Sequence, residues 1–198
     1  MTAGALCSFD IRAVSTALMR SFSQRGDTQV LDEPLYGHYL ATTGAPHPGR
    51  EELIEELETD ATKVIAEVIL GSCDSPVLFL KQMVHHLTPD LDLAFLDECV
   101  NVMLIRDPAH VISSLVNQLP EPTMRDVGLE RQVELFRDLR RRGQDPPVLD
   151  ARELLLDPDH VMSELCTRLG LTWDEAMLTW PAGPRPEDGP WARYWYDN

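Results

Sequence analysis

The segment of this sequence best suited to chemistry is an arginine that directly follows an apolar, β-branched run. Residues 100–105 form the run, Arg106 ends it, and the next two residues, Asp-Pro, are a typical start of a helix. The helical repeat then turns Ser113 or Ser114 back toward Arg106. A permanent cation and a hydroxyl group at the carboxyl end of a parallel strand can bind a phosphate group. A surface arginine paired with the neighbouring aspartate explains this segment alone equally well.

A second candidate anion-binding segment is the loop between the first predicted strand and the first predicted helix. Arg12 lies in this loop, and Ser15 and Thr16 lie near the N-cap of the helix. Together with the N–H groups of the first helical turn, these side chains can hold a phosphate-like group. The loop lacks the glycine and lysine residues of the GxxxxGK[ST] motif, which disfavours ATP hydrolysis. An ordinary capped helix is the competing interpretation.

Short apolar runs alternate with helical patterns, and this alternation predicts an α/β fold with a parallel sheet. The predicted strands cover residues 3–8, 29–31, 76–80, 100–105 and 147–150. The predicted helices cover residues 15–25, 48–69, 125–142 and 157–169, with a further helix that begins at or just after Pro108. We expect one domain over residues 1–198. Its last part, residues 180–198, should be an ordered tail or lid, because its tryptophan side chains favour burial.

The formal net charge of −16 limits the partners of this protein. A nucleic-acid backbone needs a basic surface, and a polyanionic acceptor would be repelled as it approached. A small anionic cofactor stays compatible, because a few cations lie beside predicted strand ends, namely Arg12, Arg20, Lys81 and Arg106. The basic run at residues 140–142 suits the negative end of a helix dipole and requires no ligand.

Composition also bounds the location of the chain. No apolar run approaches the roughly 20 residues of a membrane span, and the N-terminus lacks the pattern of a signal peptide. The four cysteines are scattered and form no CxxC pair, so we expect reduced thiols in a cytoplasmic protein and no metal site. We expect no membrane partner, and a homo-oligomer is compatible with the sequence.

Five segments, taken in order, resemble a bacterial branch of the sulfotransferase superfamily, whose donor is 3′-phosphoadenosine-5′-phosphosulfate (PAPS). They are RAVSTALMRSF, DEPLYGHYL, FLKQMVHHL, LIRDPAHVISSL and WPAGPRPEDGPWARYWYDN. The set is specific and spans nearly the whole chain, although each segment alone is weak. The resemblance implies a three-layer α/β/α domain of the P-loop type. It also implies transfer of a sulfonate group from PAPS to the hydroxyl group of a small soluble acceptor, which leaves 3′,5′-adenosine bisphosphate.

The resemblance further implies which residues bind the donor. The loop after the first strand would grip the 5′-phosphosulfate through Arg12, Ser15 and Thr16. An arginine and the serine eight residues later bind the 3′-phosphate in this family, and they correspond to Arg106 and Ser114. Ser113 is the neighbouring alternative.

The catalytic roles that the resemblance implies fall on two residues. Glu33, after the second strand, takes the place of the general base, and Lys81, at the end of the third strand, takes the place of the lysine that faces the moving sulfonate. A carboxylate that merely pairs with a nearby arginine is the alternative for Glu33. His85 and His86 are rival bases, although contact with the acceptor or helix packing suits their positions better.

Two departures from the family pattern support an alternative function. Asp10 precedes the loop arginine, where many relatives have small residues or proline, and its charge is wrong for contact with a phosphosulfate. The family usually continues past the WY motif with a segment that closes over the nucleotide, whereas this sequence stops at Asn198. The main alternative is therefore a non-catalytic or donor-altered nucleotide-binding homologue. A nucleotide-dependent kinase is a more distant one.

Overall fold

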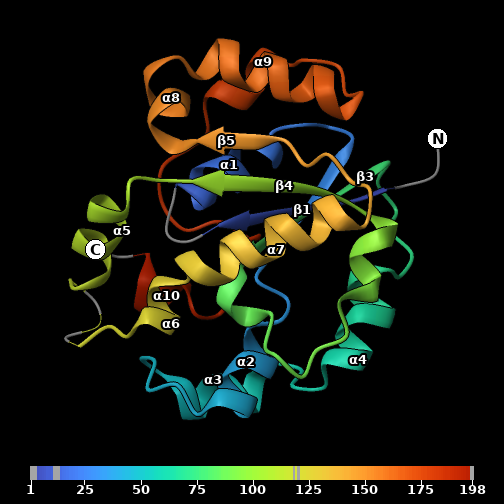
Figure 1. Cartoon of the computed structure of the whole chain (residues 1–198). Coiled ribbons are helices and arrows are strands. Elements are labelled where there is room, and N and C mark those ends of the chain that lie inside the picture. Colours follow the sequence, from blue (N-terminus) through green and yellow to red (C-terminus); the bar gives the residue numbers. More distant parts are fainter. Residues whose placement is uncertain (1–3, 11–13, 118, 120, 197–198) are drawn as a thin grey trace.

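The computed structural model describes residues 4–10, 14–117, 119 and 121–196. Within these ranges five strands form one sheet in the order β2-β3-β1-β4-β5 (Figure 1). The strands are β1 (Gly4–Asp10), β2 (Thr28–Asp32), β3 (Val77–Met83), β4 (Cys99–Ile105) and β5 (Val148–Asp150). Every neighbouring pair is parallel. The carboxyl ends of the strands therefore meet at one edge of the sheet.

Helices cover both faces of this sheet and make three layers. Because side chains alternate across a strand, Leu6 of β1 packs into one layer and Cys7 into the other. The first layer contains α1 (Ser15–Phe22), α8 (Ala151–Leu156) and α9 (Pro158–Leu169). The second contains α4 (Ala61–Val64), α5 (Pro108–Leu115) and α7 (Leu129–Arg141). The predicted α/β/α fold with a central parallel sheet is confirmed.

The prediction of one helix over residues 48–69 is wrong. The structure has α3 (Arg50–Glu56), then α4, then a π-helical turn at Ile65–Ile69. The carboxylate of Glu58 accepts hydrogen bonds from the next two backbone N–H groups, both at 3.0 Å, and Asp60 caps α4. These side chains pair with backbone groups that a continuous helix would use itself. The apolar periodicity therefore continues where the helix does not.

The predicted helix over residues 125–142 is interrupted as well. α6 (Met124–Val127) ends at Gly128, whose φ is +73°, and α7 begins there. Glycine adopts this left-handed conformation without a steric penalty, and the conformation ends a helix. Two other elements differ from expectation: the short helix α2 (Tyr36–Thr43) was not predicted, and β3 is longer than predicted, so that Lys81 lies inside the strand.

The described part of the tail, residues 180–196, packs against the first half of the chain. Arg20 in α1 pairs with Asp188 at an N–O distance of 3.0 Å. Trp191 is 3% exposed and belongs to an apolar cluster with side chains of α2 and α3. The short helix α10 (Ala192–Trp195) follows directly. These contacts hold the end of the sequence against α1, α2 and α3.

Gly49, just before α3, is a glycine that these contacts require. Its φ is +69°, and a Cβ atom there would lie 2.2 Å from the ring of Tyr194 in α10. Gly44 also has a positive φ, +63°, but a Cβ atom there would meet no described atom within 4 Å. The two positions therefore separate backbone strain from steric conflict.

We expect Gly49→Ala to lower the free energy of unfolding more than Gly44→Ala does. Left-handed strain should cost each variant about 1–2 kcal/mol. Only Gly49→Ala should also displace the Tyr194 ring, whose hydroxyl group donates to Glu52 at 2.7 Å. That loss should add roughly 1 kcal/mol. Urea unfolding of both variants measures the difference, and equal losses would show that the tail does not depend on Gly49.

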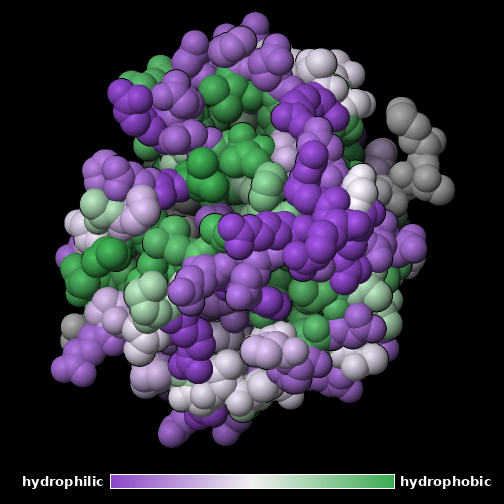
Figure 2. Space-filling model, viewed as in Figure 1, coloured by the Kyte–Doolittle hydropathy of each residue, from purple (hydrophilic) through white to green (hydrophobic). Residues whose placement is uncertain are grey.

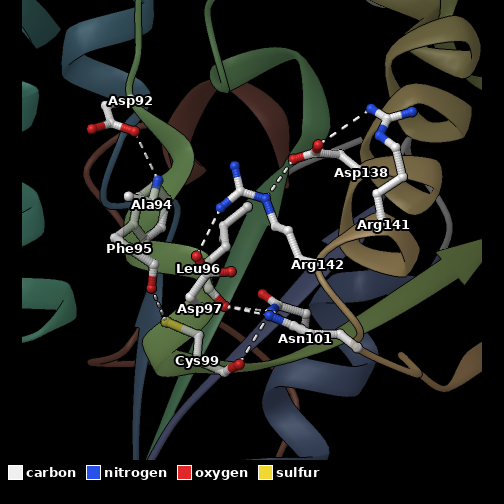
Figure 3. A network of polar contacts seen from close by, with 11 residues as sticks. Asp92, Ala94, Phe95, Leu96, Asp97, Cys99, Asn101, Asp138, Arg141 and Arg142 are labelled. Atoms are coloured by element: carbon white, nitrogen blue, oxygen red, sulfur yellow. Dashed lines mark hydrogen bonds and ion pairs between the residues drawn. The ribbon is translucent and has the colours of Figure 1, made fainter.

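A polar network surrounds the amino-terminal end of β4 (Figure 3). Arg142 pairs with Asp138 at 2.7 Å and with Asp97 at 2.9 Å. Asn101 inside β4 donates to three acceptors in the same region. The other arginines of the run at residues 140–142 also pair with aspartates. The basic end of α7 is thus used within the fold, as its position at the negative end of the helix dipole predicts.

Hydrophilic residues cover the middle of the molecular face in Figure 2, over α7. Exposed apolar side chains occur on neighbouring helices, among them Ile112 on α5 and Leu155 on α8. Over the ranges that the structure describes, none of the helices has the length and apolar character of a membrane span.

Candidate active site

A cavity of about 310 Å³ lies at the carboxyl edge of the sheet. Its wall brings together eight residues that the sequence singled out, namely Ser15, Thr16, Glu33, Lys81, His85, His86, Arg106 and Ser114. They lie at or after the ends of different strands, and parallel pairing is what collects them at one place. Ser113 is exposed and does not line the cavity, and Arg12 lies outside the described residues.

Lys81 is the centre of a buried ionic cluster on this wall. It is 2% exposed. Its ammonium group donates to Asp32 at 2.9 Å, to the hydroxyl group of Tyr196 at 3.1 Å, and to Glu33 in a shorter contact. All three N–H bonds of the ammonium group are therefore used. Asp32 and Glu33 are buried too, so water screens these charges weakly.

The backbone at Glu33 directs its side chain toward Lys81. Its φ is +45°, a left-handed value that residues other than glycine rarely adopt. The N–H group of Glu33 donates to the carbonyl group of Lys81 at 2.8 Å, and the carbonyl group of Glu33 accepts from Tyr36 at 2.9 Å. The first bond extends the pairing of β2 with β3, and the second leads into α2. Strain of this kind persists where surrounding structure fixes it, and it is common at functional sites.

Burial and neighbouring charges give these groups unusual proton affinities. Burial raises the pKa of Glu33, the Lys81 ammonium group lowers it, and Asp32 and Asp10 raise it, with a result of about 7. Burial lowers the pKa of Lys81, but Asp32 and Glu33 outweigh that effect and raise it well above its ordinary value. Glu33 therefore titrates near neutral pH while Lys81 keeps its proton. A general base and an adjacent cation need these two states.

Two helices, α5 and α1, begin near the cavity and bring further lining residues to it. Asp107 accepts from the N–H group of Ala109 at 2.8 Å as the N-cap of α5, so this aspartate serves the helix that carries Ser114 to the cavity. Helix α1 begins after Val14, which has no polar side chain to cap the first turn. Helix starts of this kind can bind anions through their N–H groups.

Comparison with known proteins decides the family. The sequence profile of a sulfotransferase domain matches residues 6–198. The chain belongs to the sulfotransferase domain family. Two proteins of Arabidopsis thaliana, named branched-chain-amino-acid aminotransferase-like protein 2 and protein 1, are 37% and 38% identical to it over 187 residues. The alignments cover 94% of this chain but 33% and 34% of the plant proteins, so the chain spans about a third of the length of these curated relatives.

Solved structures share the fold of this sulfotransferase domain. The sulfotransferase domain from the curacin biosynthetic pathway has a TM-score of 0.62 at 16% identity, over 96% of this chain and 81% of that chain. A sulfotransferase from Alicyclobacillus acidocaldarius has a TM-score of 0.61 at 16% identity, over 94% and 88% of the two chains. At such identities the likeness concerns the fold. It confirms the predicted P-loop-type architecture, as the profile confirms the predicted superfamily.

The two histidines considered as rival bases lie in the sulfotransferase domain at η2 (Val84–His86), a 3-10 turn directly after β3. His86 is 1% exposed, and its ring lies against Tyr36 and Tyr39 at centroid distances of 4.9 and 4.8 Å. Burial above all lowers the pKa of His86 well below its ordinary value. Its Nδ1 atom lies 4.0 Å from the Glu33 carboxylate. These features favour the packing interpretation of His86.

Several side chains of the candidate site were not predicted from the sequence. They are Asp32, Tyr36, His47, Asp126, Trp195 and Tyr196. The hydroxyl group of Tyr36 bonds with Nδ1 of His47 at 2.9 Å and accepts from Trp195 at 3.3 Å. Some of these residues belong to the DEPLYGHYL and WYDN segments that carried the family resemblance. That membership was the one available signal, because no local spacing connects residues so far apart in the chain.

Asp10, the departure from the family pattern, is fully buried at the end of β1 and does not line the cavity. Its charge nevertheless reaches the cluster, where it is a minor cause that raises the pKa of Glu33 and of Lys81. The candidate site therefore has a third carboxylate close to one ammonium group.

Proposed function

We propose that this sulfotransferase domain transfers a sulfonate group from PAPS to the hydroxyl group of a small acceptor. The observation that carries the proposal is the contact of Glu33 with Lys81 on the wall of a cavity that also contains Arg106 and Ser114. A carboxylate with a pKa of about 7 can take the proton of a hydroxyl group at neutral pH. The cation beside it can stabilise the charge that develops during transfer.

The lining residues fit an anionic nucleotide. Ser15 and Thr16, in the first turn of α1, would hold the 5′-phosphosulfate, together with Arg12 as the family pattern implies. Arg106 and Ser114 would hold the 3′-phosphate through one charge-assisted contact and one hydroxyl bond. When bound, PAPS supplies a sulfonate group attached to a good leaving group.

Glu33 and Lys81 divide the chemical work in this proposal. Glu33 takes the hydroxyl proton as the acceptor oxygen forms its bond to sulfur, and the bond from sulfur to the phosphate oxygen breaks. The products are a sulfate ester and 3′,5′-adenosine bisphosphate. Protonation of Glu33 weakens its attraction for Lys81, so the ammonium group becomes able to turn toward the charge on the leaving oxygen.

The acceptor in this proposal is a small, neutral or cationic metabolite. The formal net charge of −16 repels anions from the surface. Inside the cavity, the carboxylates of Glu33 and Asp126 both belong to the lining. An acidic acceptor would therefore meet negative charge both on approach and on binding.

A donor-altered or non-catalytic nucleotide-binding homologue is the second candidate function. Asp10 is the observation that favours it. A third buried carboxylate near Lys81 opposes the approach of a sulfonate group.

Binding of three nucleotides separates these candidates. We expect Arg106→Ala to weaken the binding of 3′,5′-adenosine bisphosphate by about 10- to 150-fold, which corresponds to roughly 1.5–3 kcal/mol for hydrogen bonds to a charged group. AMP lacks the 3′-phosphate, so its affinity should hardly change, and ATP should bind poorly to both proteins. Titration calorimetry gives all of these affinities.

The two serines provide the matched control for this experiment. Ser114→Ala should weaken the bisphosphate by a smaller factor than Arg106→Ala, because it removes one uncharged donor. Ser113→Ala should have no effect, since Ser113 is exposed and outside the cavity lining. A wild-type protein that binds AMP as tightly as the bisphosphate would contradict the assignment to PAPS.

A further inference from the structure

The hydroxyl group of Tyr196 enters the ionic cluster from the far end of the sequence. Tyr196 directly follows α10, whereas its partners lie in β2 and β3. Its O–H group donates to Oδ2 of Asp32 at 2.5 Å, and its oxygen accepts from Nζ of Lys81 at 3.1 Å. Lys81 also donates to Oδ1 of Asp32 at 2.9 Å. The three residues therefore form a closed ring of hydrogen bonds.

Because of this ring, the two carboxylates of the cluster receive different numbers of hydrogen bonds. Both oxygens of Asp32 have a donor, one from Lys81 and one from Tyr196, and its side chain is 1% exposed. Within the described part of the chain, the Glu33 carboxylate receives one hydrogen bond, from Lys81. Asp32 is therefore the carboxylate that balances the ammonium charge. Glu33 is the surplus carboxylate of the cluster.

We propose that Tyr196 is a positioning residue of this site. Its hydroxyl group ties Asp32 to Lys81, offsets part of the Asp32 charge and leaves Glu33 as the group that accepts a proton. The inference rests on the proposed function for the meaning of that proton transfer, and on geometry for the assignment of the residue. Tyr196 itself exchanges no proton with the acceptor.

Several charged or titratable groups face Glu33 from the elements packed around it. They are Asp10 of β1, Asp32 of β2, Tyr36 of α2, Lys81 of β3, His86 of η2 and Tyr196. Loss of the Tyr196 hydroxyl would remove a donor that stabilises the ionised form of the cluster. Without that donor, the charge of Asp32 would repel the ionised form of Glu33 more strongly, and the pKa of Glu33 would rise.

The test measures that proton directly in the free protein. Carbon-13 labelling of glutamate side-chain carboxyl groups follows the titration by NMR, and Glu33→Gln identifies the Glu33 signal by its absence. Tyr196→Phe should move the titration midpoint upward by about one pH unit or more, as expected for a lost hydrogen bond to a charged group. Incorporation of 3-fluorotyrosine in place of Tyr196, a stronger donor, should move it downward.

Tyr194→Phe is the matched control, because it removes a nearby hydroxyl group that donates to Glu52, at 2.7 Å, instead of to the ionic cluster. It should leave the Glu33 midpoint unchanged. An unchanged midpoint in Tyr196→Phe, or an equal shift in both variants, would overturn the proposal and reduce Tyr196 to a tail anchor.

A second measurement keeps this inference separate from the proposed function. The pH profile of sulfonate transfer from PAPS to benzyl alcohol, a neutral probe acceptor whose hydroxyl group does not titrate in this pH range, should shift upward in Tyr196→Phe along with the NMR midpoint. If the midpoint shifts but no protein transfers sulfonate to any acceptor, the proposed function fails and the positioning role stands. If transfer occurs and its profile ignores Tyr196→Phe, the positioning role fails and the function stands.

Discussion

Replacing Glu33 with glutamine should lower the turnover of the sulfotransferase domain by roughly 10²–10⁴-fold, the usual contribution of a positioned general base. Glutamine keeps the size of the side chain and can still bond with Lys81, but it cannot accept a proton. Nucleotide affinity should change little, because Glu33 is not among the residues assigned to the phosphates. Steady-state kinetics with PAPS, together with calorimetry of the bisphosphate, tests both statements.

The pH dependence sharpens this prediction. With the pKa of Glu33 at about 7, the turnover of the unmodified protein should rise as pH increases through neutrality, since only the ionised carboxylate accepts a proton. The residual activity of Glu33→Gln should lack this rise. Near-normal turnover in the variant would instead favour His85 or His86 as the base.

Glu33→Gln should lower turnover but raise the free energy of unfolding at high pH relative to the unmodified protein. The pKa of Glu33 is about 7 in the folded chain and 4.5 when unperturbed, so between these values the folded state binds more protons. The free energy of unfolding contributed by this group therefore falls as pH rises across that window. Glu33→Gln removes the effect. Urea unfolding at pH 5 and pH 8 should show the variant gaining stability relative to the unmodified protein at the higher pH.

Replacing Lys81 with methionine should lower kcat by roughly 10²–10³-fold, as the loss of one electrostatic contact to a transition state does. It should also destabilise the fold by about 3–5 kcal/mol, because it leaves buried carboxylates without their cation. The loss of stability should grow with pH, because Glu33, with a pKa of about 7, can take up a proton in acid but is ionised in base, where it needs its cation most. The measurements are kcat, donor affinity and urea unfolding at several pH values.

Lys63→Met is the matched control for charge removal. Lys63 pairs with Glu58 at 2.6 Å, but both side chains are largely exposed, and surface pairs of this kind contribute at most about 1 kcal/mol. Stability and kcat should therefore stay close to those of the unmodified protein. If Lys81→Met weakens only donor binding and leaves kcat intact, Lys81 is a ground-state anchor and its assigned role in transfer is wrong.

The sheet could be predicted because buried parallel strands have continuous apolar sequences, and residues 77–80 are a clear case. The boundaries of the helices were harder to predict from the sequence. Over residues 48–69 the apolar face repeats without a break, while the interruption depends on how Glu58 and Asp60 bond to local N–H groups. A hydropathy pattern does not register such bonds, because each side chain can pair with the backbone or with water at similar free energy.

The candidate site divides in the same way. Glu33, Lys81 and Arg106 follow apolar runs, and parallel strands carry such residues to one edge whatever the loops do. Their presence at the cavity could therefore be anticipated. Tyr196 and Asp126 reach it through contacts between distant segments, which no local repeat encodes. The backbone strain at Glu33 was equally hidden, because a φ of +45° at glutamate goes against the preference of that residue.

The strand order also has a consequence for the synthesis of this protein. β1 is the central strand, yet its partners β3 and β4 begin at Val77 and Cys99. A ribosome therefore releases β1 and β2 long before the sheet can assemble. Two hydrogen bonds of the ionic cluster can form only after Tyr196 has been synthesised. A nascent chain that has exposed Glu33 and Lys81 still lacks the hydroxyl group that completes their surroundings, so the mature site comes into existence only when nearly all of this domain has left the exit tunnel.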